Sequence, residues 1–465
     1  MLMWTDVLIV GGGFGGVTVA HRLERLLASR AERVLLVSTE NFLTFTPLLP
    51  EAASGTLEPR HAVAALRQVL HRTDVLIGEV VGLDAAARRG SVIDLNGDRH
   101  DVAYRVLVFA PGSIPTTSPI SGLLEHAVGF KTLPDAIWLR NRVLRQLEAA
   151  DATVDLQRRR EVLTFTFVGG GYAGVEALAE LESLARDALA AYPSLRLGDF
   201  RWVLVEAADH VLPGLDSRLA AYTVDQLRRS GIEVHLGTRM VATEDGVITL
   251  SDPRIPPYRS ETIVWTAGQR PNPLGVRAGL PVDERDRVVV DDHMRVIGVD
   301  DAFALGDVAA VPGPDGGTSP PTAQHTVRQA RAAAANVAAV FGAAATRRFA
   351  HRTLGLAVTL GKHRGTAQVR RFVFTGWLAW WMGRTYHLVM LPGWGRRVRV
   401  VTDWTLALFF PRDISQLGAL GPPSRLPDGL DREGSSRPSG LTEHPQRAVT
   451  ISRLRVVGPS AQLED

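Results

Sequence analysis

VLIVGGGFGG, residues 7–16, sets a run of apolar residues directly before a run of glycines. Gly11, Gly13 and Gly16 have the spacing G-x-G-x-x-G, and a helix is expected from near Val17. In a strand–turn–helix unit such glycines allow a tight turn, and the N–H groups at the helix start can bind a pyrophosphate. A purely structural turn is the alternative explanation for a glycine run alone.

An acidic side chain about 20 residues after such a loop normally accepts hydrogen bonds from a ribose. Glu40 is the nearest candidate, two positions later than expected, and Ser38 stands at the expected position. With strand, helix and acid all present, a dinucleotide site is favoured over a structural turn. Phe14, Gly15 and Asn41 are expected to belong to the same site.

The pattern occurs a second time in FTFVGGGYAG, residues 165–174, where Gly169, Gly171 and Gly174 keep the same spacing. Glu206, at the end of the following apolar run, is the corresponding acid. A solvated strand end is the alternative role for this residue. We read the repeat as an internal duplication of strand–helix units with buried parallel strands.

Glu206 also bears on which nucleotide the second site prefers. Ala207 and Ala208 follow it, so no arginine is available to pair with a 2′-phosphate. A 2′-phosphate would therefore meet an uncompensated carboxylate. The sequence predicts NADH rather than NADPH.

The predicted fold class is α/β, with two Rossmann-like dinucleotide-binding domains, the first interrupted by the second. Further strands are expected at RVLLVS, RVLVFAPGS, WVLVEA, TIVWTAG and DAFALGD, and a long alanine-rich helix at TAQHTVRQARAAAANVAAVFG. The expected domains are 1–130 and 267–345 (first nucleotide), 131–266 (second nucleotide), 346–412 (C-terminal, with amphipathic membrane-associating helices) and 413–465 (a disordered tail).

Composition excludes several kinds of protein. The chain has 465 residues and a formal net charge of +3, too little to argue for nucleic acid. It has no cysteine, which excludes disulfides, thiolate metal sites and dithiol redox relays. The histidines and carboxylates show no metal-ligand spacing, so no metal is expected. Neither a signal peptide nor a run of roughly 20 apolar residues long enough to span a membrane is expected.

Two dinucleotide sites in a chain without cysteine narrow the chemistry. One nucleotide is expected to be a bound flavin and the other a visiting nicotinamide, because hydride transfer needs a donor ring stacked on an acceptor ring.

Five further segments support this expectation: ENFLTFTPLLPEAASGTLEPRHA (40–62), VFAPGS (108–113), TAGQRPNP (266–273), ALGDVAAVP (304–312) and PPTAQHTVRQA (320–330). Together with the glycine loops they resemble the type II NADH:quinone oxidoreductases, the non-pumping NADH dehydrogenases within the pyridine nucleotide-disulfide oxidoreductase-like flavoproteins. The resemblance covers about residues 5–415, with Pro111 in place of a threonine.

The resemblance implies FAD in the first domain and NADH in the second. It implies that Asp307 binds the ribityl chain and that Ala323 and Gln324 lie at the pyrimidine end of the ring. Glu176 matches a glutamate near both rings, where a carboxylate could position the nicotinamide or relay protons. Complementing the helix dipole is its alternative role. Further cofactor contacts are expected at Ala110 and Gly112 (FAD) and at Tyr172 and Gly268 (NADH).

A membrane quinone is the implied electron acceptor, with contacts expected at Pro47, Gln324 and Arg328. Arg328 stands where the family often has a second glutamine. Participation in proton transfer is left open for Lys131, Lys362, His325 and His363.

The leading functional hypothesis is hydride transfer from NADH to FAD, followed by transfer of two electrons to quinone without proton pumping. Two alternatives remain open. One is a soluble flavoprotein that reduces a protein carrier or oxygen, and the other is a redox sensor that binds partners.

FVFTGWLAWWMG, residues 372–383, and DWTLALFF, residues 403–410, are apolar, rich in tryptophan and close to arginines. We expect two interfacial helices that bind a membrane surface through residues 372–410, on the cytoplasmic face of the cell membrane. Packing in a protein core is the alternative. A homodimer is left open.

Overall fold

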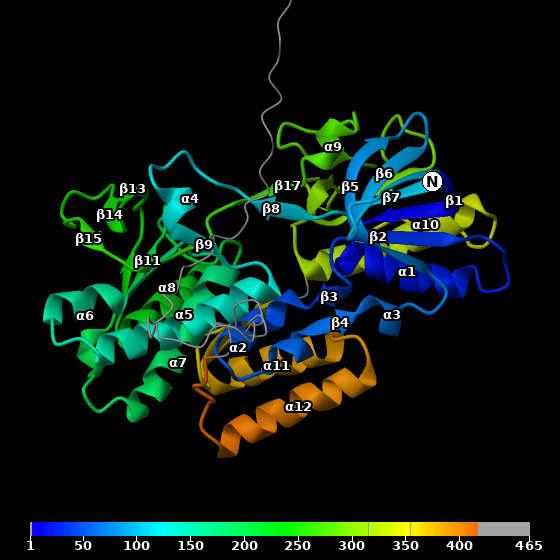
Figure 1. Ribbon diagram of the computed structural model, residues 1–465. Coiled ribbons are helices and arrows are strands. Elements are labelled where there is room, and N and C mark those ends of the chain that lie inside the picture. The colour runs from blue at the N-terminus through cyan, green and yellow to red at the C-terminus, as the bar shows by residue number, and fades with distance from the viewer. Residues whose placement is uncertain (1, 315, 354, 417–465) are drawn as a thin grey trace, which may run out of the picture. The chain divides into compact units, whose positions relative to one another are not determined.

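Each glycine loop follows the central strand of a parallel β-sheet (Figure 1). In the first sheet the parallel order is β5–β2–β1–β7–β19, and antiparallel β6 bridges β5 and β7. Its strands are β1 (Leu2–Val10), β2 (Val34–Ser38), β5 (Asp74–Asp84), β6 (Arg89–Asp94), β7 (Arg99–Phe109) and β19 (Ala302–Ala304). All five residues of β2 are buried, as expected for a strand covered on both faces.

The second sheet is parallel throughout, in the order β12–β11–β10–β16–β9. Its strands are β9 (Ala127–Gly129), β10 (Thr164–Val168), β11 (Arg201–Val205), β12 (Ile232–His235) and β16 (Thr262–Trp265). The α/β class, the duplication and the expected strands are confirmed. In both sheets the glycine loop lies where the strand order reverses, which is where open α/β sheets bind ligands.

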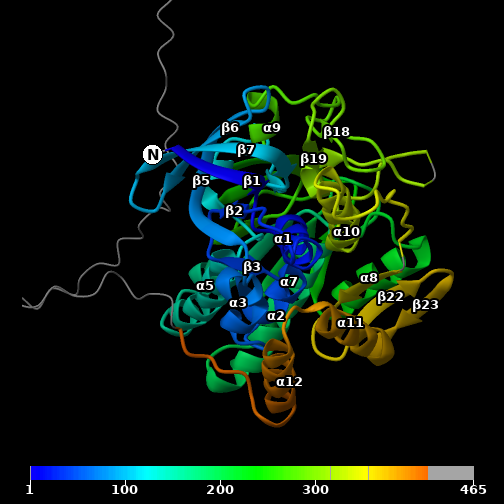
Figure 2. The ribbon, with the colours of Figure 1, turned by 90° about the vertical axis from the view of Figure 1, so that its right-hand side faces the viewer.

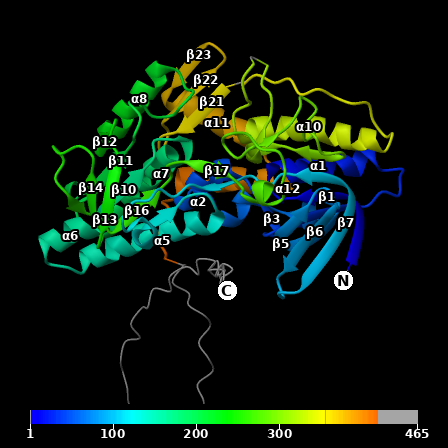
Figure 3. The ribbon, with the colours of Figure 1, turned by 90° about the horizontal axis from the view of Figure 1, so that it is seen from above.

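The helices of the first sheet position its glycine loop. Helices α1 (Phe14–Leu26) and α10 (Ala323–Val340) lie side by side against this sheet (Figures 2 and 3). The long alanine-rich helix is thus confirmed as α10. The expected start of α1 near Val17 is wrong, because Gly13 is already the N-cap and Gly15 and Gly16 are helical. The N–H groups of the loop therefore belong to the first turn of the helix.

The other helices before α10 lie around both sheets, and among them α9 packs against β5 of the first sheet. They are α2 (Leu49–Ala53), α3 (Leu66–Val69), α4 (Leu123–His126), α5 (Leu133–Asp151), α6 (Leu156–Val162), α7 (Tyr172–Ala188), α8 (Ser217–Arg229) and α9 (Leu274–Arg277). Short strands complete this part: β3 (Phe42–Thr44), β4 (Val63–Ala65), β8 (Ser113–Pro115), β13 (Met240–Glu244), β14 (Val247–Leu250), β15 (Tyr258–Arg259), β17 (Gln269–Pro271), β18 (Val288–Val289) and β20 (Ala309–Ala310).

A three-stranded antiparallel sheet and two helices follow α10. They are β21 (Gly355–Thr359), β22 (Gly365–Val369), β23 (Phe372–Thr375), α11 (Gly376–Met390) and α12 (Trp394–Phe409). The expected helix over 372–383 is wrong in its first turn, because Phe372–Thr375 pairs with β22 as a strand and Gly376, with a φ of 69°, starts the helix. Helix α12 lies below both sheets in Figure 1.

The structure describes residues 2–314, 316–353 and 355–416, which all lie in the unit Met1–Ala419. Most of the expected tail, from residue 417 onward, is outside these residues. In the described part, none of the helices combines the length and the apolar character needed to cross a membrane. The domain limits given above stay predictions.

Candidate active site

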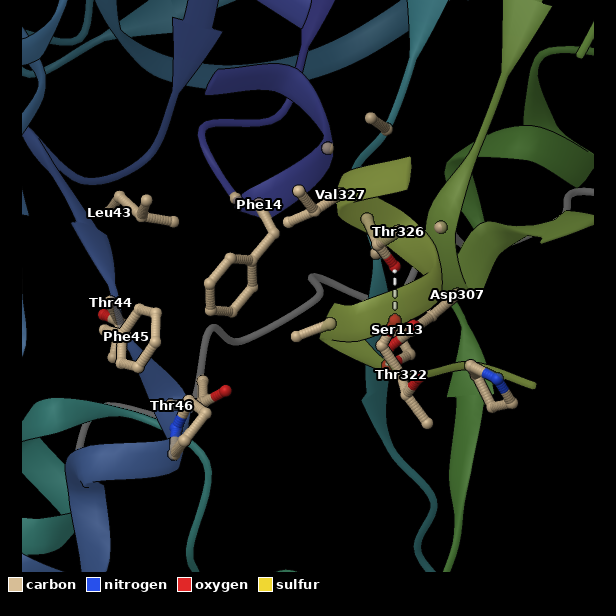
Figure 4. Close-up of a pocket in the computed structure, with 18 of the residues that line it drawn as sticks. Phe14, Leu43, Thr44, Phe45, Thr46, Ser113, Asp307, Thr322, Thr326 and Val327 are labelled. Atoms are coloured by element: carbon tan, nitrogen blue, oxygen red, sulfur yellow. Dashed lines mark hydrogen bonds between the residues drawn. The ribbon is translucent and has the colours of Figure 1, made fainter. Parts of the chain in front are cut away.

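Both glycine loops line one cavity of about 2340 Å³. Its wall also includes residues of α2, β8, α10, β21, β22 and α11, so segments far apart in the sequence meet there. The close-up in Figure 4 shows part of the wall, with Phe14 from α1 facing Phe45, and Asp307 near Ser113. The two phenyl rings meet edge to face, with centroids 5.5 Å apart.

The first glycine loop is shaped by close backbone approach. Gly11 has a φ of 107°, and a Cβ there would lie 2.3 Å from the carbonyl oxygen of Ala110. A Cβ on Gly16 would lie 1.9 Å from the carbonyl oxygen of Gly11. A Cβ on Gly13, by contrast, would meet no described atom within 4 Å. Two glycines are therefore required by the fold, and the third leaves open space at the start of α1.

The second loop repeats this geometry. Gly169 has a φ of 114°, and a Cβ on Gly174 would lie 2.3 Å from the carbonyl oxygen of Gly169. A Cβ on Gly171, like one on Gly13, would meet no described atom within 4 Å. Glu206 accepts hydrogen bonds from the backbone N–H of Gly170 and, at 2.7 Å, from that of Ala208. The carboxylate is thus held beside the loop, as expected for a group that binds the ribose of a nucleotide on that loop.

A polar cluster borders the cavity where β8 and β17 pair. The Ser113 hydroxyl lies 2.9 Å from Asp307 Oδ2 and 2.6 Å from Gln269 Oε1. Lys131 Nζ donates to Ser113 Oγ at 2.9 Å and to Gln269 Oε1 at 3.1 Å. Burial lowers the pKa of Lys131, and the nearby Asp307 opposes that shift. The Ser113 hydroxyl thus links Asp307 to the half-buried ammonium group of Lys131.

Glu176 lies at the start of the second turn of α7 with its side chain almost fully buried at the cavity wall. Its Oε1 accepts hydrogen bonds from the backbone N–H of Thr359 at 2.9 Å and from the Thr359 hydroxyl at 3.4 Å. Burial is the main cause that raises the pKa of Glu176 to about 8, with a smaller contribution from Glu180. A carboxyl group with this pKa is protonated at neutral pH and can donate a proton into the cavity.

The N-terminus of α10 presents Gln324 to the cavity. The Gln324 amide lies 3.2 Å from Nε2 of His351 and 3.4 Å from the hydroxyl of Tyr386. Burial lowers the pKa of His351 to about 4, so the ring is neutral at pH 7 and can donate from one nitrogen. The hydroxyl of Thr322 caps the helix by accepting a hydrogen bond from the backbone N–H of His325 at 3.4 Å. Figure 4 shows Thr322 and Thr326 in this first turn.

Helix α11 contributes to the same wall. His387 is a cavity residue whose ring lies 6.4 Å from that of Phe45, and burial lowers its pKa to about 4. Met382, Tyr386 and Met390 line the cavity beside it. The helix that contains Trp377, Trp380 and Trp381 thus also forms one side of the site.

Most residues predicted from the sequence line this cavity. They are Gly11, Gly13, Phe14, Gly15, Glu40, Pro47, Ala110, Gly112, Gly171, Tyr172, Gly174, Glu176, Asp307, Ala323 and Gln324. Among the described lining residues, Gly16, Asn41, Gly169, Glu206, Gly268 and Arg328 are absent. Gly16 and Gly169 belong to the loop backbones, and Glu206 accepts a hydrogen bond from the N–H of Gly170 in the second loop. Arg328 instead donates to the carbonyl oxygen of Gln324 at 2.7 Å. A direct quinone contact by Arg328 therefore receives no support from this geometry.

Sequence reasoning missed several lining residues. Ser113 and Gln269 lie inside motifs quoted above, so those motifs could have indicated them. Tyr386 and His387 follow the tryptophan cluster, and no spacing pattern indicates them. Away from the cavity, Asp291, Asp292 and His293 lie close enough to share a cation, but Asp292 is already paired with Arg348. The expectation of no metal stays a prediction.

Comparison with known proteins identifies the family. Residues 5–335 match the model of the pyridine nucleotide-disulphide oxidoreductases. A type II NADH:quinone oxidoreductase of Mycobacterium tuberculosis is 30% identical over 419 residues, which cover 87% of this chain and 88% of the relative. An internal alternative NAD(P)H-ubiquinone oxidoreductase of Arabidopsis thaliana mitochondria is 27% identical, over 88% of this chain and 85% of that protein.

The fold agrees with these relatives. The structure of NDH2 from Plasmodium falciparum in complex with NADH superposes with a TM-score of 0.80, at 18% identity, and covers 88% of this chain and 99% of that one. The family model spans both glycine loops and the segment that carries Asp307. The chain therefore belongs to the type II NADH:quinone oxidoreductases, a group of the pyridine nucleotide-disulphide oxidoreductase family.

Proposed function

We propose that the protein oxidises NADH and reduces a membrane quinone through bound FAD, without pumping protons. The observation that carries this proposal is the single cavity lined by both glycine loops, because two nucleotides bound there can bring their rings together. Family membership supports the same reaction.

FAD is proposed at the first loop. The open space at Gly13 and at the start of α1 fits a pyrophosphate, and Asp307, held by Ser113, fits a polyol chain. Gly11, Phe14, Gly15, Gly16, Ala110, Gly112, Ala323 and Gln324 complete the proposed contacts. Glu40 is the proposed ribose ligand, with Asn41 beside it. When bound, the flavin supplies the hydride and electron chemistry, and the residues around it supply binding and orientation.

NADH is proposed at the second loop, as the electron-donating substrate. Gly171 faces open space at the start of α7, and Glu206, which accepts a hydrogen bond from the Gly170 N–H of the loop, is the proposed ribose ligand. Gly169, Gly174, Tyr172 and Gly268 are the further residues of this site. Ala207 and Ala208 offer no cation for a 2′-phosphate, so the preferred donor is NADH.

Glu176 is the proposed catalytic residue. It lines the cavity, lies one turn from the nucleotide loop and holds a proton at neutral pH. Quinone reduction to quinol takes up two protons with two electrons, so a protonated carboxyl beside the site can deliver one of them. Pro47 and Gln324 are the proposed quinone contacts, since both line the cavity and the Gln324 amide lies 3.4 Å from the Tyr386 hydroxyl of α11.

Membrane association is proposed through α11 and α12. On α12, Trp394, Val398, Val401 and Leu408 are exposed at a spacing that places them on one helix face. Arg399 is exposed on the same helix, so basic and aromatic groups occur together, as at a lipid headgroup boundary. The proposed location is peripheral, at the cytoplasmic face of the cell membrane, with a second copy of the chain as a further partner.

An anaerobic titration tests the reaction. The purified protein should show a flavin spectrum that NADH bleaches and that a soluble quinone then restores. NADPH should bleach it far more slowly at the same concentration. Failure of NADH to bleach the flavin would contradict the proposal. Reoxidation by oxygen or a protein carrier, but not by quinone, would favour the soluble-flavoprotein alternative.

A further inference from the structure

Three carboxyl groups are buried together behind the cavity. Glu176 and Glu180 are four residues apart on α7, so they occupy the same face of the helix one turn apart. Glu51 comes from α2, which packs against α7. The three residues are 9%, 1% and 3% exposed, respectively. Water therefore screens their mutual repulsion only weakly.

Two arginines from the C-terminal segment reach this group. Arg384 of α11 donates to Glu51 at 3.1 Å, and its guanidinium lies between the rings of Trp380 and Trp404. Arg412, which follows α12, donates to Glu180 at 3.5 Å. Its side chain is 8% exposed. Each of the two inner carboxyl groups thus has a cation, whereas Glu176 accepts its hydrogen bonds from Thr359.

We propose that Arg412 is a positioning residue for the active-site proton: by neutralising Glu180, it sets the charge that Glu176 faces one helical turn away. Removing that cation should leave Glu180 as an uncompensated buried acid beside Glu176. Removing the Glu180 carboxyl should leave the Arg412 cation there with Asp187 as its remaining acidic partner, since Asp187 Oδ2 lies 3.6 Å from Arg412 Nε.

The groups that surround Glu176 support this inference. Burial is the largest cause of its raised pKa, the Thr359 N–H opposes it, and Glu180 and Glu51 raise the pKa further. Tyr172 is a further titratable group near Glu176, and burial raises its pKa to about 12, so it stays neutral at physiological pH. Of the two neighbouring acids, Glu180 shares a helix face with Glu176, which makes the Glu180–Arg412 pair the most direct electrostatic control of its proton.

Helix α12 leads directly into Arg412 and carries the exposed apolar face described above. The link to quinone reduction rests on the proposed function: the segment proposed to lie on the membrane also supplies the cation that tunes the proton donor. The electrostatic effect of Arg412 on the Glu176 carboxyl can be measured in the protein without enzymatic turnover.

The test is a pH titration of the Glu176 carboxyl by infrared spectroscopy of the purified full-length holoprotein. The protonated carboxyl band is assigned by its loss in Glu176→Gln. In Glu180→Gln the midpoint should fall by about one pH unit, because a neighbouring anion is removed. In Arg412→Gln it should rise by a similar amount. The Glu180→Gln/Arg412→Gln double variant and Arg412→Lys should both stay near the wild-type midpoint.

Arg254→Gln is the matched control, because it removes an arginine from an exposed pair with Asp252 and should leave the midpoint unchanged. An unchanged midpoint in Glu180→Gln, a clearly shifted midpoint in the double variant, or shifts of both single variants in the same direction would overturn the proposal. If Arg412→Gln fails to fold, Glu180→Gln and the double variant still decide the question. A protein that shows the shifts but does not oxidise NADH would refute the proposed function and leave this coupling intact.

Discussion

Glu176 accepts hydrogen bonds from a strand far away in the sequence, and burial keeps its carboxyl group protonated at neutral pH. Its place two residues after the last glycine of the second loop follows from the motif. Its hydrogen-bond partner, Thr359, is 183 residues away, and its neighbour Glu51 comes from a different helix. Tertiary packing brings these groups together, so no local spacing could have indicated a protonated carboxyl.

The raised pKa of Glu176 predicts a specific pH dependence of stability. Between pH 4.5, the ordinary value, and about 8, the folded protein holds a proton that the unfolded chain has released. Stability should therefore fall as pH rises through this window, by up to about 1.4 kcal/mol per unit of pKa difference. Glu176→Gln should remove this slope in urea unfolding measured from pH 5 to 8. Glu125→Gln, at an exposed position, should keep the wild-type slope, and a wild-type slope in Glu176→Gln would contradict the prediction.

At the scale of single elements, the strand–loop–helix units were the most predictable part of the fold. Buried strands and glycine spacing are local signals, so β1, β10 and both loops could be read directly. The segment 372–383 was harder, because phenylalanine, valine and tryptophan suit a strand and an apolar helix equally well. Phe372–Thr375 forms a strand because it pairs with β22.

The two kinds of loop glycine should respond differently to alanine. Gly16→Ala places a Cβ 1.9 Å from the Gly11 carbonyl oxygen, so the loop and α1 must move and both stability and flavin content should fall sharply. Gly13→Ala meets no described protein atom within 4 Å, so the fold should survive while FAD binding weakens. Thermal unfolding and the flavin-to-protein absorbance ratio separate the two outcomes. Equal losses of stability in both variants would contradict this distinction.

Helix α12 should be anchored by a buried hydrogen bond. The indole N–H of Trp404 donates to Glu51, which also receives Arg384. Trp404 therefore packs into the protein, as the core-packing alternative proposed, while Trp394 is 78% exposed. Trp404→Phe removes the donor and should lower the free energy of unfolding by about 1–3 kcal/mol. Trp394→Phe should change it by less than about 0.5 kcal/mol, and equal effects would contradict the anchor.

On the scale of the whole molecule, the sequence predicted the two parallel sheets and the nucleotide loops but not the closure of the cavity. The residues that close it, Tyr386 and His387, come from α11, whose position depends on packing against β21 and β22. The same helix buries Trp380 and exposes Trp377 and Trp381. Helix α11 thus combines features of a core helix and of an interfacial helix, because it buries Trp380, lines the cavity with Tyr386 and His387, and exposes Trp377 and Trp381.

The exposed aromatic side chains of α12 predict how the molecule should bind a lipid surface. The exposed Trp394 and Phe409 lie on α12 away from the cavity lining, so replacing both by serine should weaken binding to vesicles without unfolding the protein. Co-sedimentation with vesicles should fall at least several-fold, because two large aromatic side chains no longer enter the interface. Oxidation of NADH with a short-chain, water-soluble quinone should stay near the wild-type rate, since that acceptor needs no membrane. Exposed arginines beside the aromatic residues further predict tighter binding to anionic than to neutral vesicles, with the difference lost at high salt. Undiminished vesicle binding in the double serine variant would exclude α12 as the membrane contact, and loss of activity with the soluble quinone would assign these side chains to the cavity instead.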